Sequence, residues 1–172
     1  MDMSSNARRL MIRRLTIDDV EVFRRIRLEA LSCEPSAFAS VHEDWVDLSD
    51  EEWRNRLNEP AFVAFINEEP VGMMGLSRHR PRKLAHRATL VSVYVRKSAR
   101  GFGAAADLLT TVSDYARSLG ILQLELAVNA ENTVAARFYR RHGFIEVGRI
   151  PGGVLDDGRA IDDIIMVWRL GG

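Results

Sequence analysis

The chain has 172 residues, 47% of them hydrophobic, and its 24 Lys and Arg residues balance 24 Asp and Glu residues to give a net charge of +0. This balance does not indicate a nucleic-acid partner, and no stretch approaches the ~18 consecutive apolar residues of a membrane span. Because Cys33 is the single cysteine, no internal disulfide can form, and we expect a cytoplasmic protein with one domain over residues 1–172 and a disordered lead-in at 1–7.

The first third of the chain predicts a strand followed by a helix. The strand covers residues 8–15. Thr16 follows it as a capping hydroxyl with acids in the next turn, and the helix extends to about Ser32. Apolar residues at helical spacing predict the face that packs into the core, namely Val20, Phe23, Ile26 or Arg27, and Ala30 or Leu31.

A shorter helix and a series of strands come next. Ser49 and Glu52 have the spacing of a capping box, which predicts a helix to about Asn58. Strands are predicted at 62–66, 71–77 and 88–95, with a polar turn at 67–70 and a basic loop at 78–87.

The remaining elements complete an α/β pattern. Helices are predicted at 103–119 and 132–142, each closed by a glycine, and strands at 122–128, 144–148 and 161–170. A loop containing Asp156, Asp157 and Gly158 joins the last two strands. The order β, α, α, β, β, β, α, β, α, β, β predicts a mixed α/β sheet and not a regular βαβ repeat.

A glycine-rich segment, Arg100-Gly101-Phe102-Gly103-Ala104-Ala105-Ala106, lies between a predicted strand and a predicted helix. Its small residues let backbone N–H groups approach a ligand, and the helix start adds unpaired donors and a positive dipole end, so the segment could hold a phosphate. A P-loop is excluded, because Lys and Ser or Thr do not follow Gly103. A dinucleotide-binding turn fits less well, because five residues separate the strand from the glycines and Glu125, about 20 residues on, lies inside its strand. A plain packing turn is the remaining alternative.

Two motifs carry a family resemblance. Val93-Tyr94-Val95 precedes Arg100, Gly103 and Ala105, which fill the pattern (Gln/Arg)-x-x-Gly-x-(Gly/Ala). Residues 132–144 match the pattern N-x-x-A-x-x-F-Y-x-x-x-G-F. The chain therefore resembles the GCN5-related N-acetyltransferase (GNAT) superfamily over nearly its whole length. It departs from many members at Arg96, where they have proline.

The resemblance implies a GNAT-like fold, with a predominantly antiparallel central sheet and a splayed parallel strand pair flanked by helices. It also implies an acyltransferase that moves the acetyl group of acetyl-CoA to a primary amine by direct attack in a ternary complex, without a metal. The residues implied to bind the cofactor are Val93, Tyr94, Val95, Arg100, Gly101, Phe102, Gly103, Ala104, Ala105, Ala106, Asn132, Ala135 and Tyr139.

Tyr139 is the predicted catalytic residue. Asn132, Ala135 or Ala136, and Tyr139 share one helix face, and a phenol there can protonate a departing thiolate. Packing of Tyr139 in the core is the alternative. The general base stays open between a water relay and the candidates His86, Glu43, Asp44 and Asp162. Some family members have a glutamate on the central strand, but Thr89 or its neighbours hold that place here, and none of them is acidic.

Other properties are left open by the sequence. Acids at residues 43–59 could attract a cationic amine, and the basic run at 78–87 could attract an anion, but each is also typical of a solvated surface. Cys33 is expected to fill space at a helix end and not to carry an acyl group. The acceptor is a small molecule or a protein amine, a homodimer is allowed, and the alternative function is a non-catalytic module that binds acyl-CoA.

Overall fold

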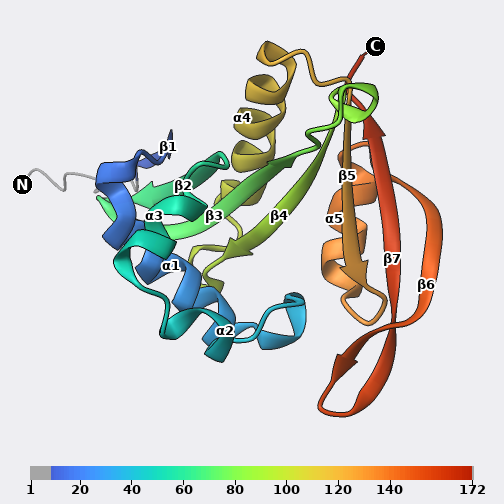
Figure 1. Ribbon diagram of the computed structural model, residues 1–172, viewed down its shortest axis with the longest axis horizontal. Coiled ribbons are helices and arrows are strands. Elements are labelled where there is room, and N and C mark those ends of the chain that lie inside the picture. Colours follow the sequence, from blue (N-terminus) through green and yellow to red (C-terminus); the bar gives the residue numbers. More distant parts are fainter. Residues whose placement is uncertain (1–8, 172) are drawn as a thin grey trace, which may run out of the picture.

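The computed structural model describes residues 9–171, so the lead-in expected at 1–7 lies outside the described residues. These residues form a seven-stranded sheet in the order β1-β2-β3-β4-β5-β7-β6 (Figure 1). Its strands are β1 (Leu10–Arg14), β2 (Ala61–Ile66), β3 (Glu69–Arg78), β4 (Arg87–Val95), β5 (Gln123–Asn129), β6 (Ile145–Asp156) and β7 (Arg159–Arg169). All neighbouring strands are antiparallel except β4 and β5, which confirms the predicted fold class.

Helices cover both faces of the sheet (Figure 1). They are α1 (Val20–Cys33), α2 (Glu43–Val46), α3 (Asp50–Arg56), α4 (Ala104–Ser118) and α5 (Thr133–Arg141), with 3-10 turns η1 (Ile17–Asp19), η2 (Pro35–Ala37), η3 (Arg82–Leu84) and η4 (Lys97–Ala99). Because successive strand residues point to opposite faces, β2 sends Phe62 and Ala64 into one core cluster with α4, and Val63 and Phe65 into another with α1. No helix among residues 9–171 is long and apolar enough to cross a membrane.

The N-terminal helices follow their predicted signals. Ser49 Oγ accepts a hydrogen bond from the N–H of Glu52 at 3.2 Å, and the Glu52 carboxylate accepts one from the N–H of Ser49 at 2.7 Å, which confirms the capping box. The predicted core face of α1 is buried at Val20, Phe23, Ile26, Arg27, Ala30 and Leu31. Both members of each alternative pair are therefore inside, including the charged Arg27.

The predicted lengths of two strands are wrong. Residues 149–156 were expected in a loop, but they extend β6, which joins β7 through Asp157 and Gly158. These two residues have φ of 49° and 76°, as a two-residue hairpin turn requires. Pro70 was expected in a turn but lies in β3, opposite Phe65 at a register shift, where a residue without an N–H is tolerated.

The parallel strands β4 and β5 are paired along only part of their length. Their ladder joins Arg87–Thr89 to Gln123–Glu125, and beyond these residues the strands diverge (Figure 1). β4 also contains an irregularity in this unpaired part, where Ser92 has φ of 55° and the pairing with β3 shifts register. The predicted splayed pair is confirmed, and it leaves one backbone edge of β4 open.

Candidate active site

A cavity of about 630 Å³ lies among the diverging end of β4, the start of α4, and α5. Its lining includes every residue predicted to bind the cofactor except Phe102. The lining residues are Glu34, Ala37, Val93, Tyr94, Val95, Ala99, Arg100, Gly101, Gly103, Ala104, Ala105, Ala106, Asn132, Val134, Ala135, Phe138, Tyr139, Arg141 and His142. Two motifs that are about 30 residues apart in sequence therefore line one space.

The glycine-rich segment presents backbone donors to this cavity. Gly101 and Gly103 have φ of 90° and 79°, and a Cβ at either position would meet nothing within 4 Å. Glycine is needed there for its left-handed backbone. The first hydrogen bond inside α4 runs from the N–H of Asp107 to the Gly103 carbonyl at 2.9 Å. The N–H groups of Ala104–Ala106 therefore have no partner within the helix, which makes the N-terminus of α4 a seat for an anion.

Arg100 is held by protein groups at the edge of the cavity. Its Nε donates to the Val95 carbonyl at 3.0 Å, and its Nη2 donates to Glu34 at 2.7 Å. Its side chain is 48% exposed. Arg100 thus ties the end of β4 to the segment after α1, and its charge at the cavity is partly neutralised by Glu34.

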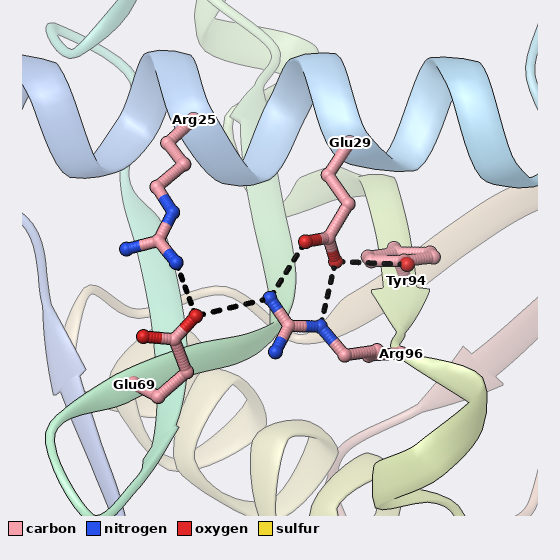
Figure 2. A network of polar contacts seen from close by, with 5 residues as sticks. All are labelled: Arg25, Glu29, Glu69, Tyr94 and Arg96. Atoms are coloured by element: carbon pink, nitrogen blue, oxygen red, sulfur yellow. Dashed lines mark hydrogen bonds and ion pairs between the residues drawn. The ribbon is translucent and has the colours of Figure 1, made fainter.

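A polar network fixes the open end of β4 against α1 (Figure 2). The Glu29 carboxylate accepts hydrogen bonds from Tyr94 Oη at 2.9 Å and from Arg96 Nε and Nη2 at 3.1 and 2.6 Å. Arg96 also contacts Glu69, which pairs with Arg25. Burial opposes ionisation of Glu29, but the donors from Arg96 and Tyr94 outweigh it and lower its pKa. Arg96, the departure from the family pattern, therefore anchors the strand that lines the cavity.

Helix α5 brings Asn132 and Tyr139 to the same cavity. Asn132 caps the helix, and its Oδ1 accepts the N–H of Ala135 at 3.2 Å, which leaves the Nδ2 donors for other partners. Tyr139 is 6% exposed, and its ring packs edge-on against Phe138 and Phe144. Burial raises the pKa of the phenol, and its hydroxyl has no hydrogen-bond partner within residues 9–171. The ring is in the core, and the residue still lines the cavity.

A second cavity, of about 330 Å³, adjoins the first. Ala37, Val93, Asn132, Ala135 and Tyr139 line both. The second cavity reaches between the diverging strands toward α1 and η2, and its further lining includes Arg27, Phe38, Ala39, Ser40, Thr89, Leu90, Val91, Ser92, Leu126, Ala127 and Val128. Tyr139 is thus one of five residues that line both cavities.

The bases considered from sequence do not line either cavity. His86 is exposed and precedes β4, and Glu43 is exposed at the start of α2. Asp44 caps the N–H of Val41 at 2.9 Å, and Asp162 accepts the N–H of Gly152 at 3.0 Å. Cys33, at the exposed end of α1, is also absent from both linings.

A polar cluster that sequence reasoning missed lies behind Thr89. Glu125 accepts hydrogen bonds from Arg87 Nε and Nη2, both at 2.8 Å, and lies 3.0 Å from His79 Nε2. The same His79 nitrogen is 3.4 Å from Thr89 Oγ1. Thr89 pairs with Glu125 in the ladder, so β5 places a carboxylate next to Thr89. No local motif signals this cluster, because His79 follows β3 while its other members come from β4 and β5.

Comparisons with known proteins identify the family of this chain. A model described as the acetyltransferase (GNAT) family matches residues 23–144. Mycothiol acetyltransferase of Brachybacterium faecium is 28% identical over 131 residues, which are 76% of this chain and 39% of that protein. An uncharacterised N-acetyltransferase of Methanocaldococcus jannaschii is 27% identical over 149 residues, which are 82% of this chain and 63% of that protein. The chain thus spans well under two thirds of the first relative and just under two thirds of the second.

Solved structures show the same fold with nearly complete coverage. A ribosomal-protein-alanine N-acetyltransferase from Brucella melitensis has a TM-score of 0.76 and 29% identity, covering 92% of this chain and 99% of that one. A putative acetyltransferase from Salmonella typhimurium, solved with acetyl-CoA, has a TM-score of 0.81 and 19% identity and covers 95% of each chain. The family match over residues 23–144, which contain both cavity-lining motifs, establishes that this chain belongs to the acetyltransferase (GNAT) family.

Proposed function

We propose that this protein is an N-acetyltransferase that transfers the acetyl group of acetyl-CoA to a primary amine by direct attack in a ternary complex. The observation that carries the proposal is the pair of adjoining cavities with Tyr139 in both linings. One cavity has the anion seat and open strand edge that suit coenzyme A, and the other offers a separate space for an acceptor.

The residues of the larger cavity fit the parts of coenzyme A. The free N–H groups of Ala104–Ala106 would hold the diphosphate, because unpaired donors and the helix dipole act together there. The open backbone edge of β4 beyond Thr89 can pair with the amides of the pantetheine arm, as an added strand does. Asn132 Nδ2 can donate to the same arm. When bound, acetyl-CoA supplies an acetyl group already activated as a thioester.

Tyr139 would act as the acid for the departing thiolate because of where it lies. Burial raises the pKa of its phenol, which keeps the group protonated but makes it a weaker acid, so its contribution would depend on its position beside the departing sulfur. A backbone N–H near Val95 would stabilise negative charge on the carbonyl oxygen during attack. For the proton lost by the amine, a water relay past Thr89 to His79 and Glu125 is the route that the geometry supports.

A thiol-release assay with acetyl-CoA and a panel of amines tests the proposal. We expect thiol release that depends on the amine and a matching acetylated product by mass spectrometry. The second candidate function, a non-catalytic acyl-CoA-binding module, is favoured only by the non-acidic Thr89. Such a module would bind coenzyme A by calorimetry and release no thiol above background with any amine.

Replacing Tyr139 tests its role as the acid. We expect Tyr139→Phe to lower kcat by about 10²- to 10⁴-fold, the usual contribution of a positioned acid, while the Kd for acetyl-CoA stays within about twofold. Tyr115→Phe is the matched control, because Tyr115 packs against Phe62 and does not line either cavity. An unchanged kcat in Tyr139→Phe would assign this ring to packing alone.

A further inference from the structure

Arg27 is a buried cation without an anionic partner. It lies on the core face of α1 and is 4% exposed. Its Nε and Nη1 are shielded from solvent and make no hydrogen bond, and no salt bridge to Arg27 occurs within residues 9–171. Buried guanidinium groups are normally paired, because removing an unpaired charge from water is costly.

Aromatic rings lie against the Arg27 guanidinium, and no group within residues 9–171 accepts a hydrogen bond from its Nε or Nη1. Its guanidinium carbon lies 5.0 Å from the centre of the Phe38 ring and 4.4 Å from that of Trp45. A second cation, Arg56, lies 4.0 Å from the same Trp45 ring. Burial and then the nearby Arg56 lower the pKa of Arg27 to about 10, so the group remains charged at neutral pH. Stacking on rings stabilises a cation but does not satisfy its N–H donors.

Arg27 lies beside the space that we propose for the acceptor. Arg27 lines the second cavity together with Phe38, Ser40, Thr89 and Tyr139. At about 330 Å³ the cavity is at the small end of the range for ligand pockets. A small molecule whose amine approaches Tyr139 would therefore bring the rest of its structure into the space that Arg27 borders.

From this geometry we propose that the acceptor is a small amine that also carries a carboxylate or phosphonate group, which Arg27 binds. This inference rests on the proposed acetyltransferase function and names its substrate class. Nη2 is the guanidinium nitrogen that is not shielded from solvent, and it can donate a charge-assisted hydrogen bond to either anion. Ser40 adds a hydroxyl to the same lining. The proposal explains why an arginine, and not a leucine, occupies a core position of α1.

Matched acceptors test the charge requirement. β-Alanine, 2-aminoethylphosphonate and β-alaninamide present similar amines beside a carboxylate, a phosphonate and a neutral amide. A set of L-amino acids and their amides extends the comparison to larger side chains. We expect the best acid to exceed its amide in kcat/KM by about 10- to 150-fold, as expected for hydrogen bonds to a charged group. The carboxylate and phosphonate arms identify which anion the cavity takes.

Substitution of Arg27 ties that preference to the residue. Arg27→Met keeps an unbranched apolar stem and should remove the preference for acids, so that acids and their amides react with similar kcat/KM. Arg27→Lys keeps the charge and should retain part of the preference. Arg24→Met is the matched control, because Arg24 lies on the same helix, carries a cation over Trp53 and does not line either cavity. It should leave the preference intact.

A binding measurement separates this inference from the proposed function. Calorimetry with the same acids, in the presence of coenzyme A, should show heat for the wild type and none for Arg27→Met. If no amine is acetylated but this difference is seen, the transferase function fails and the anion site stands. The inference is overturned if amides or a peptide with an N-terminal alanine serve as well as the acids. It is also overturned if Arg27→Met lowers the Tm and slows all acceptors equally, or if the wild type binds none of the acids.

Discussion

Gly103 and Gly120 flank helix α4 with almost the same backbone conformation, with φ of 79° and 77°. A Cβ at either position would meet nothing within 4 Å, so alanine there costs mainly the strain of the left-handed backbone, about 1–2 kcal/mol. The two glycines differ in location. Gly103 lines the larger cavity, whereas Gly120 lies at the opposite end of the helix and does not.

We therefore expect Gly103→Ala and Gly120→Ala to lower the free energy of unfolding by similar amounts, while only Gly103→Ala weakens acetyl-CoA binding. A methyl group at Gly103 would project into the open space beside the free N–H groups of α4. Loss of one such hydrogen bond to a phosphate should raise the Kd about tenfold or more. Denaturant titration and calorimetry measure the two effects. Equal losses of affinity in both variants would show that α4 stability, not contact at Gly103, controls binding.

Residues in local sequence motifs could be recognised as candidates for the site from the sequence alone. A residue whose neighbours come from distant segments could not. Gly101, Gly103, Asn132 and Tyr139 belong to local patterns, and all four line the larger cavity. The spacing of α1 allowed Arg27 to be buried, but nothing in that spacing shows that its donors lack acceptors. That property depends on Phe38 and Trp45, which enter from other segments.

At the scale of elements, the ion pair between Glu125 and Arg87 joins β4 and β5 at the closed end of their ladder. Hydrogen bonds from Arg87 lower the pKa of Glu125 against the opposing effect of burial. The unfolded chain, with a carboxyl pKa near the usual 4.5, then binds a proton more readily than the folded one. The pair should therefore stabilise the fold above this pH, and its contribution should be lost as the pH falls below it.

Thermal melts of Glu125→Gln between pH 7 and pH 3 test this prediction. We expect a Tm a few degrees below the wild type at pH 7, because Arg87 loses its partner, and a smaller difference at the acidic end. Glu131→Gln is the control, because Glu131 pairs with Arg159 on the exposed surface, where ion pairs contribute little. A constant difference between Glu125→Gln and the wild type at every pH would contradict the assigned ion pair.

The β6–β7 hairpin shows why one element was predicted too short. Burial on one face normally gives a strand its alternating pattern, but residues 145–153 of β6 are exposed on both faces. The hairpin projects beyond the rest of the sheet (Figure 1), so no core selects apolar residues at every second position. Asp157-Gly158 is a typical hairpin turn, and with the flanking strand unrecognised it was interpreted as part of a loop.

At the scale of the whole molecule, the sheet consists of a β1–β4 part and a β5–β7 part joined by one short ladder. The ladder between β4 and β5 has three residue pairs, although the core cluster between α4 and β7 spans both parts. The two motifs of the proposed cofactor site belong to different parts of the sheet, since α4 comes after β4 and α5 comes after β5. A ligand in the larger cavity should therefore contact both parts and hold them together.

Acetyl-CoA at 100 times its Kd should then stabilise the fold by about 2.7 kcal/mol, because it binds only the folded state. For a chain of this size the Tm should rise by about 5–10 °C.

Hydrogen exchange shows which segments of the sheet acetyl-CoA stabilises. Amides in residues 90–95 of β4 and 126–129 of β5 should both exchange more slowly, since these are the segments without a shared ladder. Gly103→Ala, at the same concentration, should show a smaller shift of Tm and weaker protection of both segments. Protection confined to the start of α4 would mean that the ligand binds one part of the sheet and does not bridge the two.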